Sequence, residues 1–287
     1  MKQWVIGVIG GSGLYEIESL ESRRTLEIVT PWGAPSDRLL EGVLADTRVL
    51  FLPRHGRGHR YGPSDLNYRA NIAALKMAGC TDIISVSAVG SLRTDLPPRT
   101  FVLVDQFIDR TVGRKHSFFE SGLVAHVSLA DPTCPRLSGL AAVAARQAGA
   151  PVVEGGTYLA MEGPQFSTRA ESRLYQSWGC AVIGMTNMPE ARLAREAELP
   201  YATIAMVTDY DCCHDEERPV EVEQILRCMQ DNVGKARSTI EHLITALPNR
   251  REPSPIDSAL NGAILTAPEA RDPAIVAKLQ AISRRLS

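Results

Sequence analysis

The feature that most constrains the fold is an alternation of short, mostly apolar segments with longer amphipathic stretches. Continuous apolar runs indicate strands buried on both faces, and apolar residues at three- and four-residue spacing indicate helices. Strands are predicted at Trp4 to Ile9, Val49 to Leu52, Asp82 to Ser87, Phe101 to Val104, Thr157 to Met161, Ala181 to Met185 and Tyr201 to Thr208. Helices are predicted at Asn67 to Ala78, Leu137 to Ala148, Ser167 to Trp178, Pro189 to Glu198, Val220 to Ala246 and Asp272 to Leu286. This alternation predicts a wound α/β sheet with connecting helices.

The chain is long enough for one large α/β domain or two smaller ones, and length alone does not choose between them. No break in composition divides it before Pro248, where Pro-Asn-Arg-Arg-Glu-Pro-Ser-Pro is typical of an exposed linker. We therefore predict one domain over residues 1–247 and a C-terminal extension with a helix over residues 248–287.

Charge and cysteine content restrict the partners. The net charge of −2 provides no field for gripping a nucleic-acid backbone or an anionic membrane, so a small molecule is the expected partner. The N-terminal apolar run stops at a glycine cluster and lacks the length of a signal sequence, and no stretch is long enough to span a membrane. The six cysteines form no repeating framework, which favours reduced thiols in the cytoplasm.

Two loops after predicted strands carry groups suited to an anion. Gly10-Gly11-Ser12-Gly13 offers backbone amides and the Ser12 hydroxyl, although glycines there also serve the turn conformation alone. The second loop, residues 53–60, holds three arginines and two histidines, among them Arg54 and His55. It is either a solvated basic loop or the seat of a dianion, because a guanidinium matches phosphate oxygens bidentately.

Two further loops follow apolar strands. Residues 85–91 place Ser87 and Ala88 beside the first two loops if the strands are neighbours. In the last loop, Asp209 and Asp211 face the same side, where burial and mutual repulsion raise at least one pKa and make a proton donor; an Asx turn is the alternative. The adjacent Cys212-Cys213-His214 lacks the ligand spacing of zinc sites, so no metal is predicted.

At these loops the sequence resembles the 5'-methylthioadenosine phosphorylases of the trimeric purine nucleoside phosphorylase superfamily. The motifs that carry the resemblance span nearly the whole chain in a fixed order: IGGSGLY, LPRHGRGHR, NYRANIAALK, VSAVGSLR, DQFIDRT, MEGPQFSTRAES, IGMTNMPEARLAREA and IAMVTDYDC. The resemblance implies a mixed central sheet of nine or so strands flanked by helices. It also implies a cytoplasmic homotrimer with active sites near subunit interfaces; further pairing into a hexamer stays open.

The resemblance also implies a role for each site residue. The phosphate contacts fall on Ser12, Arg54, His55, Ser87, Ala88 and Thr186. Nucleoside contacts fall on Met185 under the ribose, Phe166 and Ser167 at the purine, Asp209 and Asp211 at its N7 and N6 edge, and Val222, Ile225 and a neighbouring subunit's His126 at the methylthio end.

The expected reaction is phosphorolysis of methylthioadenosine to adenine and 5-methylthioribose 1-phosphate, with inorganic phosphate as co-substrate and no cofactor. Asp209 protonates N7 of the departing adenine, and the carboxylates favour an amino group over a 6-oxo group. Two alternatives remain: a phosphorylase for inosine, guanosine or methylthioinosine, and a nucleoside-binding protein without the reaction. Gly184, Asn187-Met188 and Cys213 depart from the common family pattern, which leaves the fine substrate preference open.

Overall fold

The computed structural model describes residues 3–11, 13–14, 16–211 and 222–283, with the backbone alone for 222–225. Its strands are β1 (Val5–Gly10), β2 (Glu21–Leu26), β3 (Leu39–Leu44), β4 (Thr47–Pro53), β5 (Asp82–Ser91), β6 (Phe101–Val104), β7 (Gln106–Asp109), β8 (Val152–Glu154), β9 (Thr157–Ala160), β10 (Val182–Gly184) and β11 (Tyr201–Tyr210). Its helices are α1 (Tyr68–Met77), α2 (Pro135–Gln147), α3 (Arg169–Ser177), α4 (Asn187–Glu196), α5 (Val222–Ala246) and α6 (Pro273–Leu279), with short 3-10 turns at Pro255–Ser258 and Pro268–Ala270.

The described strands form one mixed sheet that divides at β5. Its main path runs β2-β3-β4-β1-β5-β10-β9-β7, while β11 pairs with β5 and β6, and β6 pairs with β8. The beginning of β5 lies between β1 and β11, both parallel to it, and its end pairs antiparallel with β10 through Gly90 and Ser91. The predicted mixed α/β sheet is confirmed, with eleven strands where the resemblance implies about nine.

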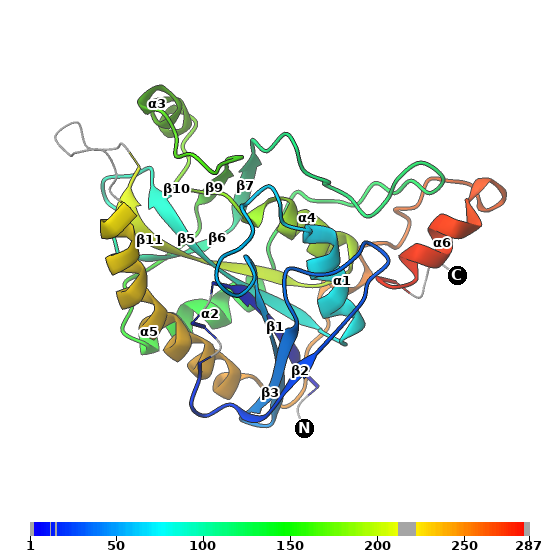
Figure 1. The fold of residues 1–287 in the computed structure, drawn as a ribbon, viewed down its shortest axis with the longest axis horizontal. Coiled ribbons are helices and arrows are strands. Elements are labelled where there is room, and N and C mark those ends of the chain that lie inside the picture. Colours follow the sequence, from blue (N-terminus) through cyan, green and yellow to red (C-terminus); the bar gives the residue numbers. More distant parts are fainter. Residues whose placement is uncertain (1–2, 12, 15, 212–221, 284–287) are drawn as a thin grey trace.

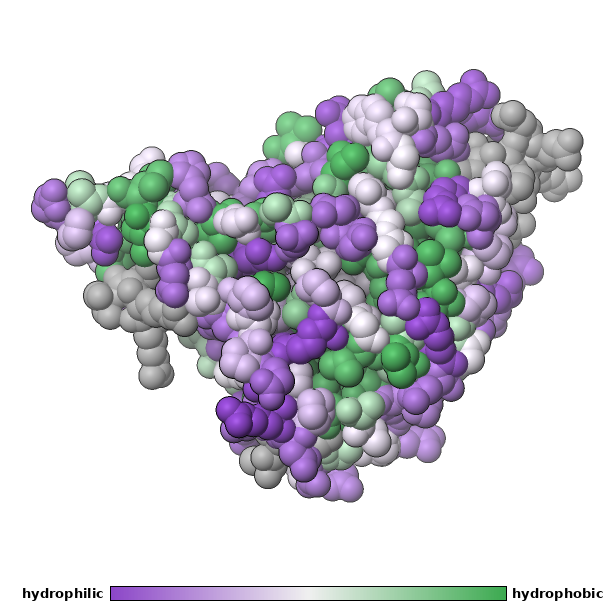
Figure 2. Space-filling view, turned by 180° about the vertical axis from the view of Figure 1, so that it is seen from behind, coloured by the Kyte–Doolittle hydropathy of each residue, from purple (hydrophilic) through white to green (hydrophobic). Residues whose placement is uncertain are grey.

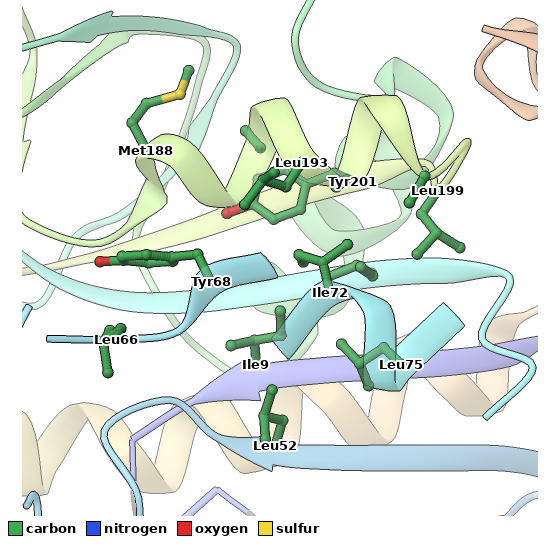
Figure 3. Packing of buried hydrophobic residues seen from close by; sticks show 14 of the residues in the cluster. Ile9, Leu52, Leu66, Tyr68, Ile72, Leu75, Met188, Leu193, Leu199 and Tyr201 are labelled. Atoms are coloured by element: carbon green, nitrogen blue, oxygen red, sulfur yellow. The ribbon is translucent and has the colours of Figure 1, made fainter. Parts of the chain in front are cut away.

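Helices cover both faces of the sheet (Figure 1). On one face, α2 and α5 pack over a core that includes Val8, Phe51 and Ile204. On the other face, α1 and α4 pack over Ile9 and Leu52, as the side chains in Figure 3 show. Because continuous apolar strands need cover on both sides, this layering follows from their composition.

The C-terminal extension folds back onto the start of β5. Asp82, which is fully buried, accepts hydrogen bonds from Arg136 and Arg251, and Arg251 also pairs with Asp257. Leu279 and Ile282 join the same core as α1 and α4. These contacts fasten residues 248–283 to the sheet.

The predicted elements differ from the observed ones in three ways. β5 continues to Ser91, so the predicted loop after Ser87 is strand. The last helix ends at Leu279, because residues 280–283 turn to place Ile282 in the core; residues 284–287 lie outside the described part. Finally, β2, β3, β7 and β8 have no counterpart in the prediction.

The molecule carries a projection at each end. α3 lies at one end, and α6 with the turns that directly precede it lies at the other (Figure 1). Figure 2 shows the hollow between these projections from behind, with hydrophobic residues in small groups between hydrophilic ones. Among the described residues, none of the helices combines the length and hydropathy needed to span a bilayer.

Candidate active site

Four of the predicted segments end at one edge of the sheet, because β1, β4, β5 and β11 are parallel neighbours. Gly10 at the end of β1 pairs with Pro53 at the end of β4, and Ile9 pairs with Ser85 of β5. β11 runs beside β5 along nearly its whole length. Ligands of open α/β sheets bind beyond the carboxyl ends of the strands, so this edge is the candidate site.

Arg54 is buried at the end of β4 and is held by a carboxylate from α4. Its Nε donates to Glu190 Oε2 over 2.9 Å, and its Nη2 donates to Glu190 Oε1 over 3.2 Å. Nη2 also donates to the Ser85 hydroxyl over 2.6 Å, and Nη1 donates to the Val86 carbonyl over 2.9 Å. Burial alone would lower the pKa of Arg54, but the charge of Glu190 raises it, so the guanidinium stays positive.

Glu190 is the centre of a buried polar network that sequence reasoning missed. Besides Arg54, its carboxylate accepts from the Ser85 hydroxyl at 2.7 Å and the Tyr201 hydroxyl at 2.8 Å. Asn187 Nδ2 donates to Ser85 and Tyr201 as well. A buried acid of this kind leaves no hydropathy signal; the signal that could have found it is the need of a buried Arg54 for a counter-charge.

His55 lies half-buried at the turn of the basic loop. Its Nδ1 lies 2.9 Å from the Tyr61 carbonyl, which can only accept, so Nδ1 carries the hydrogen and Nε2 of the neutral ring is an acceptor. Burial, together with the charge of Arg54, lowers the pKa of His55 to about 4. Residues 57–60 are exposed, so the loop has a buried half and a solvated half.

Two hydroxyls from distant parts of the chain meet at the same edge. Ser87 Oγ lies 3.4 Å from Thr186 Oγ1, and both residues are buried. Ala88 follows, half-buried, on β5. The Thr186 amide donates to the Tyr158 hydroxyl over 3.4 Å, which makes Tyr158 a further polar neighbour that the sequence did not point to.

Asp209 and Asp211 lie at the end of β11, where a register shift after Val207 breaks the regular pairing with β5. Both side chains approach Gly90: a Cβ there would lie 3.2 Å from Asp209 Oδ2 and 2.9 Å from Asp211 Cβ. Asp209 Oδ1 accepts a hydrogen bond from the Thr208 hydroxyl over 2.6 Å. Asp209 itself lies within β11, so the alternative of an Asx turn does not form. Burial, followed by the charge of Asp211, raises the pKa of Asp209 to about 6 against the effect of Thr208.

Asp211 is tied to the segment that carries the predicted purine contacts. Its Oδ2 accepts from the Ser167 hydroxyl over 2.9 Å and from Ser172 over 2.7 Å. Thr168 caps α3 directly after Ser167, which fixes this segment. Phe166 precedes it with 49% of its surface exposed. Burial raises the pKa of Asp211, while the two serine hydroxyls act in the opposite direction.

Met185 lies at the end of β10 against the 163 turn, since a Cβ on Gly163 would lie 2.5 Å from Met185 Sδ. The main chain there is held by Arg114, which donates to the carbonyls of Met185, Met188 and Glu162. Sequence reasoning missed Arg114, because an arginine in a polar segment gives no sign that it is buried.

The remaining predicted residues lie elsewhere. Ser12 is outside the described residues, and Val222 and Ile225 lie in the first turn of α5, where the backbone alone is described. His126 is exposed, and its amide donates to the Ala263 carbonyl over 2.8 Å. Its segment therefore lies with the C-terminal extension, at the end of the molecule opposite α3 (Figure 1).

The expectation that no metal is bound concerns the segment after Asp211. Residues 212–214, the Cys-Cys-His sequence, lie outside the described part. Over residues 3–211 and 222–283, gaps apart, His, Cys, Asp and Glu side chains form no group of three that could hold a metal ion.

Comparison with known proteins places this geometry in a family. Residues 5–245 match the model of the phosphorylase superfamily. An S-methyl-5'-thioadenosine phosphorylase of Bradyrhizobium diazoefficiens is 54% identical over 100% of this chain and 99% of its own length. One of Cereibacter sphaeroides is 56% identical over 98% of both.

Solved structures agree. A methylthioadenosine phosphorylase sourced from an antarctic soil metagenomic library is 44% identical, with a TM-score of 0.92 over 98% of this chain and 99% of that one. The Schistosoma mansoni enzyme in complex with adenine is 35% identical, with a TM-score of 0.80 over 98% of both chains. The chain is thus a member of the phosphorylase superfamily. Within it, the chain belongs to the S-methyl-5'-thioadenosine phosphorylase family.

Proposed function

We propose that this protein splits S-methyl-5'-thioadenosine with inorganic phosphate, giving adenine and 5-methylthioribose 1-phosphate. The observation that carries the proposal is the arrangement at the sheet edge. Asp209, with its raised pKa, shares this edge with the Arg54 guanidinium and the paired hydroxyls of Ser87 and Thr186. A proton donor and an oxyanion site on one sheet edge are what displacement of a purine by phosphate requires.

Phosphate binds through the buried half of the basic loop and the hydroxyl pair. The second Nη1 hydrogen of Arg54 is the donor we assign to a phosphate oxygen, and Ser87, Thr186 and the predicted Ser12 add hydroxyls. Neutral His55 presents Nε2 as an acceptor, which suits the P–OH group of the phosphate dianion. Ala88 contributes its backbone.

The reaction passes through a sugar with oxocarbenium character, which the phosphate dianion stabilises while it is held behind C1'. Positioning and electrostatics supply much of the rate. Asp209 donates a proton to N7 as adenine leaves, a contribution of about 10²- to 10⁴-fold for general acid catalysis. Ser167 and Phe166 hold the base, and Met185 lies under the ribose.

Specificity for adenine follows from Asp211. Its two described bonds use Oδ2, which leaves Oδ1 for the exocyclic amino group. A 6-oxopurine would place an acceptor opposite this carboxylate, and an unpaired buried acceptor costs about 1–3 kcal/mol. Val222 and Ile225 with His126 of a neighbouring subunit would enclose the methylthio group.

We further propose that the enzyme needs no cofactor beyond the phosphate co-substrate and works as a homotrimer in the cytoplasm. Three large apolar side chains, Phe166, Leu174 and Trp178, are 43% to 49% exposed on and beside α3, and an apolar group of this kind supports an interface there.

The deciding experiment is an assay of the pure protein on methylthioadenosine with and without phosphate, with inosine as the comparison. Adenine release that depends on phosphate and exceeds turnover of inosine is expected. A clear preference for inosine would assign the chain to the other purine nucleosides, and absence of base release from both would favour a binding protein.

A further inference from the structure

A buried guanidinium that holds the main chain beside Met185 lies outside the phosphate site and has no role in the proposed reaction so far. The Arg114 side chain is 1% exposed, although it belongs to the polar segment that leads toward His126. Its Nη1 donates to the carbonyls of Met185 at 2.5 Å and Met188 at 2.7 Å, and its Nη2 donates to the carbonyl of Glu162 at 2.7 Å. Three main-chain acceptors from two separate segments thus meet on one side chain.

The same side chain reaches the start of α1 as well. Nη1 lies 3.1 Å from the Tyr68 hydroxyl, with the guanidinium carbon 5.4 Å from the centre of that ring, and Nε lies 3.3 Å from the Ser64 hydroxyl. A planar fork with five donors can serve such a set, whereas a lysine has three donors on one atom. The arrangement therefore depends on arginine.

The charge of Arg114 is balanced nearby. Glu162 Oε1 lies 3.5 Å from Nε. Partial burial by itself would raise the pKa of Glu162, but the Ser64 hydroxyl and the amides of Val112 and Gly113 hold it at about 2. The carboxylate is therefore negative at any working pH, and the guanidinium is compensated without contact to phosphate.

We propose that Arg114 is a positioning residue for the nucleoside, because it fixes the main chain of Met185 and the 161–162 segment that leads to Phe166. The inference rests on the proposed function, in which these two residues contact ribose and purine. The phosphate-binding residues Arg54 and Ser87 have no described bond to Arg114. Thr186 follows Met185 directly, but its amide and hydroxyl bond to Tyr158 and Ser87, so loss of Arg114 is expected to act more on nucleoside binding than on phosphate binding.

The test compares Arg114→Lys and Arg114→Met with wild type in the full-length protein. KM for methylthioadenosine is measured at saturating phosphate, and KM for phosphate at saturating nucleoside. We expect the nucleoside KM to rise by about tenfold or more, since a misplaced contact surface weakens substrate positioning, while the phosphate KM changes less than about twofold and Arg114→Lys is milder than Arg114→Met.

Arg251→Lys is the matched control. Arg251 is likewise a largely buried arginine with several bonds, to Asp82 and Asp257, but it fastens the C-terminal extension. It is expected to lower Tm and leave both KM values unchanged. A merely structural Arg114 would behave in the same way, and that result would overturn the proposal.

Further outcomes separate this proposal from the proposed function. If the two KM values rise together in the Arg114 variants, Arg114 does not act on the nucleoside alone and the proposal is wrong. If Arg114→Met fails to fold, Arg114→Lys and Ser64→Ala decide, with an unchanged nucleoside KM in both as the contradicting result. Wild type without phosphate-dependent turnover would refute the proposed function, and calorimetric titration of methylthioadenosine into the same variants would still test Arg114.

Discussion

The two carboxylates at the end of β11 differ in their surroundings. Asp211 is engaged by two serine hydroxyls, whereas Asp209 has one hydroxyl partner and the charge of Asp211 beside it. The difference assigns the roles: the carboxylate with fewer donors keeps its proton to higher pH, and the other recognises the base.

Asp209→Asn is expected to lower adenine-nucleoside turnover by about 10²- to 10⁴-fold, because the general acid is lost. The KM for phosphate should not change, because the phosphate-binding residues are intact. In the wild type the acid form is required. The nucleoside kcat/KM at saturating phosphate should therefore be level below about pH 6, where Asp209 is protonated, and fall about tenfold per unit above it. A pH profile of both proteins checks this, and near-normal turnover of Asp209→Asn would remove Asp209 as the acid.

Burial of Asp209 also makes the stability of the fold depend on pH. Its pKa is higher in the folded protein than in the unfolded chain, so the folded state binds more protons between about pH 4 and 6. This one group therefore adds stability as the pH falls through that window and removes it as the pH rises.

Gly90→Ala is expected to displace both carboxylates. The new Cβ would lie 2.9 Å from Asp211 Cβ and 3.2 Å from Asp209 Oδ2, and Gly90 is paired on both sides by β10 and β11, so the backbone has little freedom to move. Turnover should fall by about 10²-fold or more, the lower limit for losing a positioned acid. Gly139→Ala on α2, where a Cβ meets no atom within 4 Å, is the control and should keep full activity. Equal activity of the two variants would show that a Cβ at position 90 does not displace Asp209 and Asp211.

At the scale of elements, the sequence predicts what burial imposes. β6 and β11 are apolar runs, and the prediction matches their described starts at Phe101 and Tyr201. β2 was missed because Glu21–Leu26 is almost wholly exposed and carries charged residues, so no hydrophobic pattern marks it. It is held by pairing with β3, a long-range contact that no local pattern contains.

The site shows the same division. Arg54, Ser87 and Asp209 were predicted because they lie at or just after the ends of the predicted apolar strands, and strand ends are where an α/β sheet places its ligands. The structure brings them to one edge of the sheet. Glu190 and Arg114 lie on other elements and reach the site only through the fold. Their roles depend on burial of a charge, which a single sequence does not reveal.

Glu190→Gln tests the link between α4 and β4. The substitution removes the counter-charge of the buried Arg54, and breaking one side of a buried ion pair costs about 3–5 kcal/mol of stability. The phosphate KM should rise by about tenfold, because a bidentate partner that orients the guanidinium is lost. Urea unfolding and phosphate kinetics measure the two effects.

Glu41→Gln provides the matched control for Glu190→Gln. Glu41 is also buried and pairs with Arg24 and Arg48, but it lies on β3 away from the sheet edge. It should lose stability with an unchanged phosphate KM. If Glu190→Gln leaves the phosphate KM unchanged too, the network only supports the fold.

At the scale of the molecule, the two projections suggest how copies meet. The segment with His126 is fastened to the C-terminal extension by a bridge between Ala125 and Ile264 and by the bond from the Val124 amide to the Thr266 hydroxyl. It lies at the end of the molecule opposite α3, so in the proposed homotrimer the His126 segment of one subunit would meet the α3 end of the next (Figure 1). Head-to-tail contacts close into a ring when the rotation between neighbours allows it, and the proposed homotrimer is a ring of this kind.

Oligomers mixed from two variants test this arrangement. Asp209→Asn keeps His126 but lacks the acid, and His126→Ala keeps the acid but loses a wall of the methylthio pocket, which should raise its KM for methylthioadenosine about tenfold. When the two variants are co-expressed in equal amounts, about one quarter of all sites in a closed ring combine an intact Asp209 with a neighbour's intact His126. Those sites should restore turnover with the wild-type KM. Sedimentation is expected to show the proposed trimer. A mixture that shows only the raised KM of His126→Ala would place His126 outside the neighbouring site.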